Sequence, residues 1–154
     1  MTLSPMNENS KSMIKHIMVP YDKSETANRA FEYALDMAKK YNSTISIVSC
    51  VPIQVPTDPY FGSAYIETTK LLKEDAINSI SKLESQLRDA NIRFKTDVLE
   101  TISITESLTT YAESHNVDLI IIGSRGLGGF KKLLLGSVAS GVSQHSKCPV
   151  LIVK

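Results

Sequence analysis

Short apolar runs alternate along the chain with longer segments in which apolar residues recur every three or four positions. The runs are rich in β-branched residues and stop at turn-forming sequences, which is typical of buried strands. They predict five strands, over residues 14–20, 44–51, 94–99, 117–122 and 149–153. The helical period predicts helices between them, over about 24–41, through 76–89, from 103 onwards and over 133–145.

Local signals support the ends of two of these helices. Ser24 is a good N-cap for the first helix, and two lysines near its end suit the negative end of the helix dipole. The sequence from Ser103 to Glu106 (SITE) is a capping box that opens the third helix. Residues 52–63 hold three prolines and Gly62, so we predict one long loop there.

Strands and helices alternate from one end of the pattern to the other, without a repeat or a linker. This order favours a parallel sheet that is covered by helices on both faces. We therefore predict a single α/β domain with a doubly wound parallel sheet over residues 14–154. Residues 1–13 are polar and offer nothing to bury, so we expect a flexible N-terminal tail.

The segment after the fourth strand is the candidate site, because open parallel sheets bind ligands at the carboxyl ends of their strands. It has four glycines within residues 123–129, whose amides can approach a ligand closely and form an anion nest. Gly136 and Ser137 could add a hydroxyl and further N–H groups, and Arg125, Lys131 and Lys132 add positive charge. The alternative is a flexible turn with solvated lysines. The segment is neither a P-loop nor a dinucleotide-binding fingerprint.

Charge and cysteine content narrow the class of protein. The chain has 17 basic and 16 acidic residues and a net charge of +1, without the basic excess that is typical of a nucleic-acid binder. No apolar stretch approaches the roughly 20 residues that span a membrane, and no signal-peptide run opens the chain. Cys50 and Cys148 form no CxxC pair, so we expect inert thiols in a cytoplasmic protein.

The three histidines, His16, His115 and His145, fall on different predicted elements. No carboxylate or cysteine stands near them at metal-ligand spacing, so the sequence predicts no metal site. It also shows no constellation for acid–base or nucleophilic catalysis, and we name no catalytic residue.

The spacing of the glycines resembles that of a known family. Gly123, Gly126, Gly136 and Ser137 fit the pattern G-x2-G-x9-G-[ST], which is carried by the nucleotide-binding members of the universal stress protein family. The similarity covers about residues 15–154, including the opening IMVPYDKSETANRAFEYA and the closing KCPVLIVK. The resemblance implies a Rossmann-like sheet of strand order 3-2-1-4-5, in which the first and fourth strands are neighbours.

The resemblance also implies a site for an adenine nucleotide. Asp22 would bind the ribose, Pro20 and Tyr21 would form part of the adenine pocket, and the backbone of Val51 would recognise adenine. Asp22 could instead be only a turn former. The ribose and phosphates would be held by Gly123, Ser124, Arg125, Gly126, Leu127, Gly128 and Gly129, and closed over by Gly136, Ser137, Val138 and Ala139.

ATP is the expected ligand, with or without Mg²⁺, and AMP and ADP are alternatives. We predict a regulatory stress-response protein that hydrolyses ATP slowly or not at all. Two alternative hypotheses are an ATPase or phosphotransferase that acts with a partner, and a nucleotide-free dimeric scaffold. The resemblance further implies a homodimer through the strand at 150–154. Tyr60, Phe61 and Tyr65 could either form a lid over the nucleotide or cover the second helix.

Overall fold

The computed structural model describes residues 12–128 and 134–154. Its five strands form one parallel sheet in the order β3-β2-β1-β4-β5, which confirms both the doubly wound fold and the order that the family resemblance implied. Two parts of the prediction lie outside the described residues: positions 1–11 of the expected N-terminal tail, and Gly129, Lys131 and Lys132. The strands are β1 (His16–Pro20), β2 (Thr44–Pro52), β3 (Phe94–Thr101), β4 (Leu119–Gly123) and β5 (Val150–Val153).

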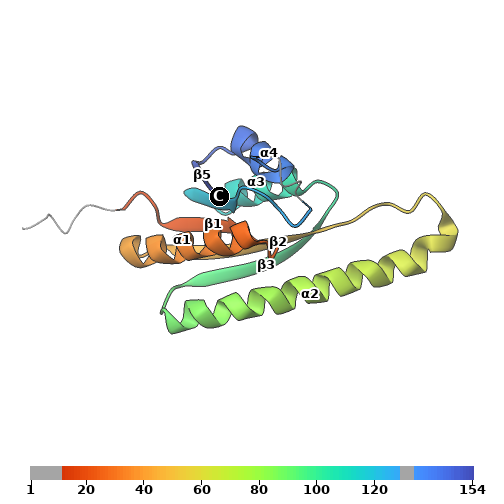
Figure 1. The fold of residues 1–154 in the computed structure, drawn as a ribbon, viewed down its shortest axis with the longest axis horizontal. Coiled ribbons are helices and arrows are strands. Elements are labelled where there is room, and N and C mark those ends of the chain that lie inside the picture. The colour runs from red at the N-terminus through yellow and green to blue at the C-terminus, as the bar shows by residue number, and fades with distance from the viewer. Residues whose placement is uncertain (1–11, 129–133) are drawn as a thin grey trace, which may run out of the picture.

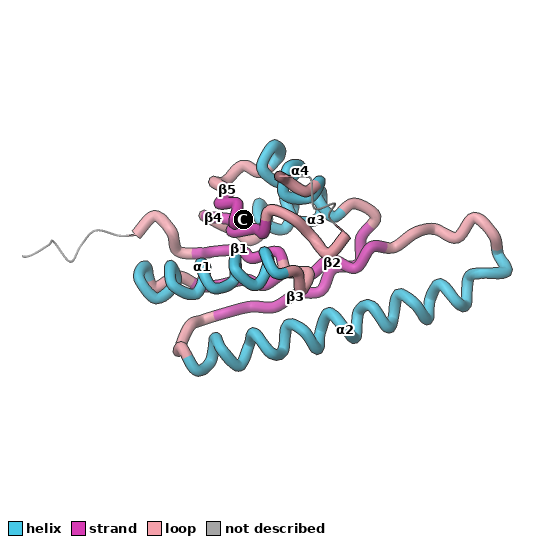
Figure 2. The backbone as a smooth tube through the Cα atoms, in the orientation of Figure 1, coloured by secondary structure: helices cyan, strands magenta, loops and turns pink. Residues whose placement is uncertain are grey.

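Four α-helices and one short 3₁₀ helix connect the described strands, and the α-helices cover both faces of the sheet (Figures 1 and 2). Two apolar clusters result, because successive strand side chains point to opposite faces. Ile17 and Val19 pack with α1 and α2, whereas Met18 between them packs with α3 and α4. The helices are α1 (Glu25–Tyr41), α2 (Gly62–Asp89), α3 (Ile104–Ser114) and α4 (Ser137–His145), with the 3₁₀ helix η1 at Pro59–Phe61.

The predicted N-caps Ser24 and Ser103 are confirmed, but the reciprocal half of the predicted capping box is not, because the Ser103 N–H donates to Thr101 Oγ1 at 3.0 Å instead of to the Glu106 side chain. The Ser24 hydroxyl accepts the Ala27 N–H at 3.1 Å, and Ser103 accepts the Glu106 N–H at 3.4 Å. Helix α1 packs close to the sheet, because Ala27 and several other residues of its buried face are alanines with small side chains. The start of α1 is thereby fixed beside the end of β1, where the predicted site lies.

Two predicted boundaries are wrong. Helix α2 begins at Gly62, more than three turns before the periodic apolar residues. The loop predicted at 52–63 is confirmed over residues 53–61, where it includes η1. Its first half projects beyond the sheet (Figures 1 and 2), and its buried residues are Ile80, Leu83 and Leu87. Helix α4 begins at Ser137 rather than near residue 133, because Gly136 has an extended conformation and is the N-cap. No helix in the described part of the chain is long and apolar enough to cross a membrane.

Candidate functional site

A cavity of about 470 Å³ opens at the carboxyl ends of β1, β2 and β4. Its size is within the roughly 300–1,000 Å³ range of small-molecule sites. It lies where the strand order reverses, which is the expected position for a ligand in an open parallel sheet. The structure brings thirteen of the predicted site residues to its wall: Pro20, Tyr21, Asp22, Gly123, Ser124, Arg125, Gly126, Leu127, Gly128, Gly136, Ser137, Val138 and Ala139.

Among the predicted site residues that the structure describes, Val51 is the one that does not line the cavity, and its neighbour Cys50 does. The carbonyl of Val48 accepts the N–H of Tyr21, the residue after β1, at 2.9 Å. On the other side, Ile53 donates its N–H to the carbonyl of Thr101 at the end of β3, at 2.8 Å. Residues two apart in a parallel strand direct their peptide groups to the same neighbour. The peptide groups of Cys50 therefore face the side where β1 has ended, and those of Val51 face β3. On the wall of this cavity it is therefore Cys50, and not Val51, whose peptide groups are directed away from β3.

Sequence reasoning also missed the apolar end of the cavity. Its wall includes Ile104 and Leu108 from α3 and Ile122 from β4, besides Ser24, Ala27 and Val48. The alternation of inward positions along the strands is a signal that could have identified Val48, Cys50 and Ile122. Burial raises the pKa of the Cys50 thiol to about 11, so this wall stays uncharged at neutral pH.

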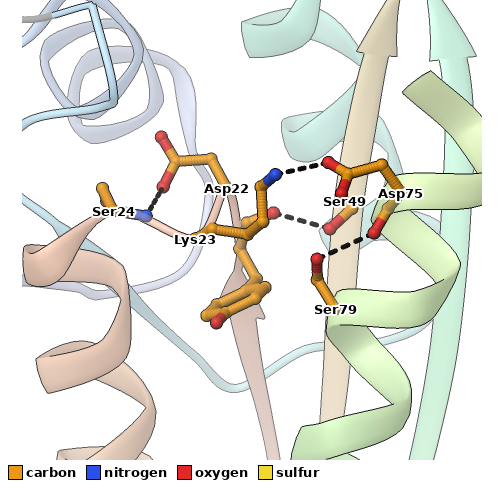
Figure 3. A network of polar contacts seen from close by, with 7 residues as sticks. Asp22, Lys23, Ser24, Ser49, Asp75 and Ser79 are labelled. Carbon is orange, nitrogen blue, oxygen red and sulfur yellow. Dashed lines mark hydrogen bonds and ion pairs between the residues drawn. The ribbon is translucent and has the colours of Figure 1, made fainter. Parts of the chain in front are cut away.

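Asp22 stands at the polar end, and its carboxylate is held by the turn that leads into α1. Its Oδ1 accepts the Ser24 N–H at 3.0 Å, which fixes the side chain in front of the helix (Figure 3). A Cβ added to Gly126 would lie 2.8 Å from Asp22 Oδ2. The second carboxylate oxygen therefore lies next to Gly126, which is part of the segment 123–128, called the glycine segment below.

The residue after Asp22 joins this turn to α2. Lys23 has a left-handed backbone with φ of 68°, which is uncommon for a residue other than glycine, asparagine or aspartate. Its ammonium forms an ion pair with Asp75 of α2, and Ser49 donates its hydroxyl to the Tyr21 carbonyl at 2.6 Å (Figure 3). The turn that presents Asp22 is thus tied to two neighbouring elements.

The glycine segment is closed at its base by backbone hydrogen bonds. Gly136 donates its N–H to the Ser124 carbonyl at 2.6 Å, and Ser124 donates to the Val153 carbonyl at 2.7 Å. Helix α4 starts immediately afterwards, with no side-chain cap and no acidic residue in its first turn. The first N–H groups of such a helix attract anions, so this wall suits a phosphate.

Other candidate groups have structural partners. His16 contacts the Ser46 hydroxyl at 2.7 Å and the His115 carbonyl at 3.0 Å, and burial lowers its pKa. Tyr60, Phe61 and Tyr65 are not among the residues that line the cavity, which leaves the lid interpretation without support. Within residues 12–128 and 134–154, no cluster of three or more histidine, cysteine or acidic side chains could hold a metal ion.

The chain belongs to the universal stress protein family, whose model matches residues 13–154. Among curated relatives it is similar to universal stress protein MJ0531 of Methanocaldococcus jannaschii, with 28% identity over 99% of this chain and 89% of the relative. It is also similar to universal stress protein YxiE of Bacillus subtilis, with 28% identity over 92% of this chain and 100% of the relative.

Solved structures share the fold. Universal stress protein UspA from Lactobacillus plantarum superposes with a TM-score of 0.79, at 23% identity, over 92% of this chain and 98% of its own. Two further universal stress proteins, each with a TM-score of 0.63, were solved with an adenine nucleotide. One is in complex with cAMP, at 23% identity over 92% and 98% of the two chains. The other, from Arabidopsis thaliana, has AMP bound, at 16% identity over 91% of each chain.

Proposed function

We propose that this protein binds an adenine nucleotide, with ATP as its ligand, and acts as a regulatory stress-response protein. The observation that carries the proposal is the cavity in which the Asp22 carboxylate, the glycine segment and the start of α4 meet at the reversal point of the sheet. Family members with this fold hold cAMP and AMP, which supports an adenine nucleotide in particular. Two free cysteines support a place in the reducing cytoplasm.

The two ends of the cavity suit the two ends of the nucleotide. Adenine fits the apolar end against Ile104 and Ile122, with its edge against the peptide groups of Cys50. The ribose hydroxyls donate to Asp22, since an ionised carboxylate only accepts hydrogen bonds. The phosphates then reach the glycine segment and the first turn of α4, where N–H groups are available. Mg²⁺ would enter on the phosphate oxygens.

Binding, rather than rapid turnover, is the function that this wall supports. Among the described residues that line the cavity, Asp22 is the single carboxylic acid and there is no histidine. Asp22 Oδ1 already accepts a hydrogen bond from the backbone of Ser24. Fast hydrolysis needs a general base that positions water, so we expect ATP to act as a stabilising ligand or signal.

Thermal unfolding with and without nucleotide tests the proposal. ATP·Mg²⁺ at about 100 times its dissociation constant adds about 2.7 kcal/mol to the free energy of unfolding. For a domain of this size we expect Tm to rise by roughly 5–10 °C. GTP at the same concentration is the control, because its base presents a different hydrogen-bonding edge. An equal rise with GTP, or none with ATP in nucleotide-free protein, would contradict an adenine site.

The edge of the sheet supports a homodimer through residues 150–154. Strand β5 is the last of the sheet, with β4 on one side, and Leu151 is 37% exposed. Apolar edge strands invite pairing, and a two-fold axis lets the same edge serve both copies. Light scattering at micromolar concentration should give twice the monomer mass, and Leu151→Lys should shift it to the monomer. Leu71→Lys on exposed α2 is the control, and a monomeric wild type would refute the interface.

A further inference from the structure

Thr26, in the first turn of α1, is bound to the beginning of the glycine segment. Its hydroxyl donates to the Arg125 carbonyl at 2.6 Å and accepts the Arg125 N–H at 3.4 Å. The side chain is nearly buried, with 9% of the residue exposed. One hydroxyl therefore contacts both polar groups of a residue that is 99 positions away in the sequence.

This contact requires an unusually close approach of β4 to α1. A Cβ added to Gly123 would lie 2.5 Å from Thr26 Oγ1 and 2.7 Å from Ala27 N, closer than real Cβ atoms come to such atoms. The first glycine of the motif therefore has a packing role in addition to its place in the cavity wall. It lets the end of β4 pass so near to α1 that Thr26 can reach Arg125.

The Arg125 carbonyl and the Gly126 N–H belong to the same peptide unit. The described chain has no cis peptide bonds, and in a trans unit these two groups point in opposite directions. When Thr26 holds the carbonyl against α1, the Gly126 N–H is turned away from α1. Gly126 lines the cavity and faces Asp22 Oδ2, so this orientation matters for any phosphate or ribose bound there.

We infer that Thr26 is a positioning residue of the nucleotide site: its hydroxyl fixes the Arg125–Gly126 peptide before the ligand arrives. The inference rests on the proposed nucleotide function for its consequence, but the contact itself exists without a ligand. A prearranged segment binds more tightly, because less conformational entropy is lost on binding. Thr26 does not have to touch the nucleotide to raise its affinity.

Thr26→Val and Thr26→Ser separate the hydroxyl from the shape of the side chain. Valine keeps the branched shape but cannot donate a hydrogen bond. Because its methyl group does not fit 2.6 Å from the Arg125 carbonyl, that carbonyl must also move. Serine loses the methyl group but keeps the hydroxyl. We expect Thr26→Val to bind ATP about tenfold more weakly, from the loss of roughly one buried hydrogen bond. Thr26→Ser should restore most of the affinity, measured by titration calorimetry.

Limited proteolysis of the nucleotide-free protein provides a readout that does not depend on ATP. Trypsin cuts after arginine, and Arg125 is only partly exposed, so release of its backbone should speed cleavage at the Arg125–Gly126 bond about tenfold in Thr26→Val. Mass spectrometry identifies the cut, and unchanged cleavage rates at other sites distinguish local release from unfolding. Thr68→Val, on exposed α2, is the matched control and should change neither cleavage nor affinity.

The outcomes separate the two proposals. Unchanged cleavage at Arg125 in Thr26→Val overturns the inference, and so does faster cleavage with unchanged ATP affinity. Equal behaviour of Thr26→Val and Thr26→Ser overturns it as well, because the hydroxyl would then be irrelevant. A wild-type protein that binds no ATP refutes the proposed function and, with it, the role of Thr26 in nucleotide binding. The cleavage assay still decides in that case whether Thr26 holds the Arg125–Gly126 peptide.

Discussion

Gly126→Ala is expected to weaken ATP binding by tenfold to a hundredfold, while Gly128→Ala leaves the affinity within about twofold. The new Cβ at position 126 would lie 2.8 Å from Asp22 Oδ2, so the carboxylate must turn away from the ribose site. Hydrogen bonds to a charged group contribute roughly 1.5–3 kcal/mol, which corresponds to that loss of affinity. At Gly128 an added Cβ meets no atom within 4 Å. Titration calorimetry measures both variants.

The fold should tolerate both substitutions. The atom nearest to position 126 is the end of a flexible side chain, so we expect the free energy of unfolding to change by less than about 1 kcal/mol. A double-mutant cycle with Asp22→Ala tests the cause. If Gly126→Ala acts through Asp22, it should have little further effect once Asp22 is an alanine. Equal losses in Gly126→Ala and Gly128→Ala would show instead that loop flexibility controls binding.

Most of the fold was predictable because its strongest signals are local. Strand runs such as residues 44–51 are buried on both faces, so their composition alone distinguishes them from the helices. The first half of α2 was not predictable in this way. Ile66 and Leu71 are exposed there, and the first buried residue of the helix is Ile80. The earlier turns therefore have no buried face that would produce a helical pattern of apolar residues. At α4 the predicted helix was too long. The leucines before Gly136 continue the apolar pattern on the N-terminal side of the N-cap, although the helix begins only at Ser137.

The position of the cavity was predictable from the sequence, but the orientation of every group around it was not. The glycine motif identified a segment that does line the cavity, since motif spacing is a property of the sequence. Whether Cys50 or Val51 presents its peptide groups to the cavity depends on which strand lies beside each and on where β1 ends. Both are tertiary facts, and a shift of one residue reverses the direction of every peptide group in a strand. The contact of Thr26 with Arg125 joins distant segments and has no local signal.

The glycines of the motif therefore have different physical roles, because each has different neighbours in the folded chain. Gly126 leaves room for a carboxylate, whereas Gly123 leaves room for a helix. An added Cβ at Gly136 would come 3.2 Å from the Ser124 carbonyl, at the hydrogen-bonded base of the segment. Substitutions at these positions should separate into effects on binding and effects on stability, and Gly123 provides the largest effect of the second kind.

Gly123→Ala is expected to reduce the free energy of unfolding by about 3 kcal/mol, the upper end of the usual cost of overpacking. Its Cβ would lie 2.7 Å from Ala27 N and from Thr26 C, and backbone atoms cannot rotate away as a side chain does. Helix α1 would have to move off the sheet, although it buries Phe31 there. Because typical domains have only about 5–15 kcal/mol in total, this loss is large. Urea unfolding followed by circular dichroism measures it.

Two further variants define the cause of this expected loss. Gly62→Ala, at the open start of α2, adds a Cβ with no atom within 4 Å and should leave stability unchanged or raise it by about 0.4–1 kcal/mol. Removing the nearby hydroxyl in Thr26→Ala should not rescue Gly123→Ala, because the backbone of α1 stays in the way. A Gly123→Ala protein within about 1 kcal/mol of wild type would mean that α1 can yield. The close approach that lets Thr26 reach Arg125 would then not depend on a glycine.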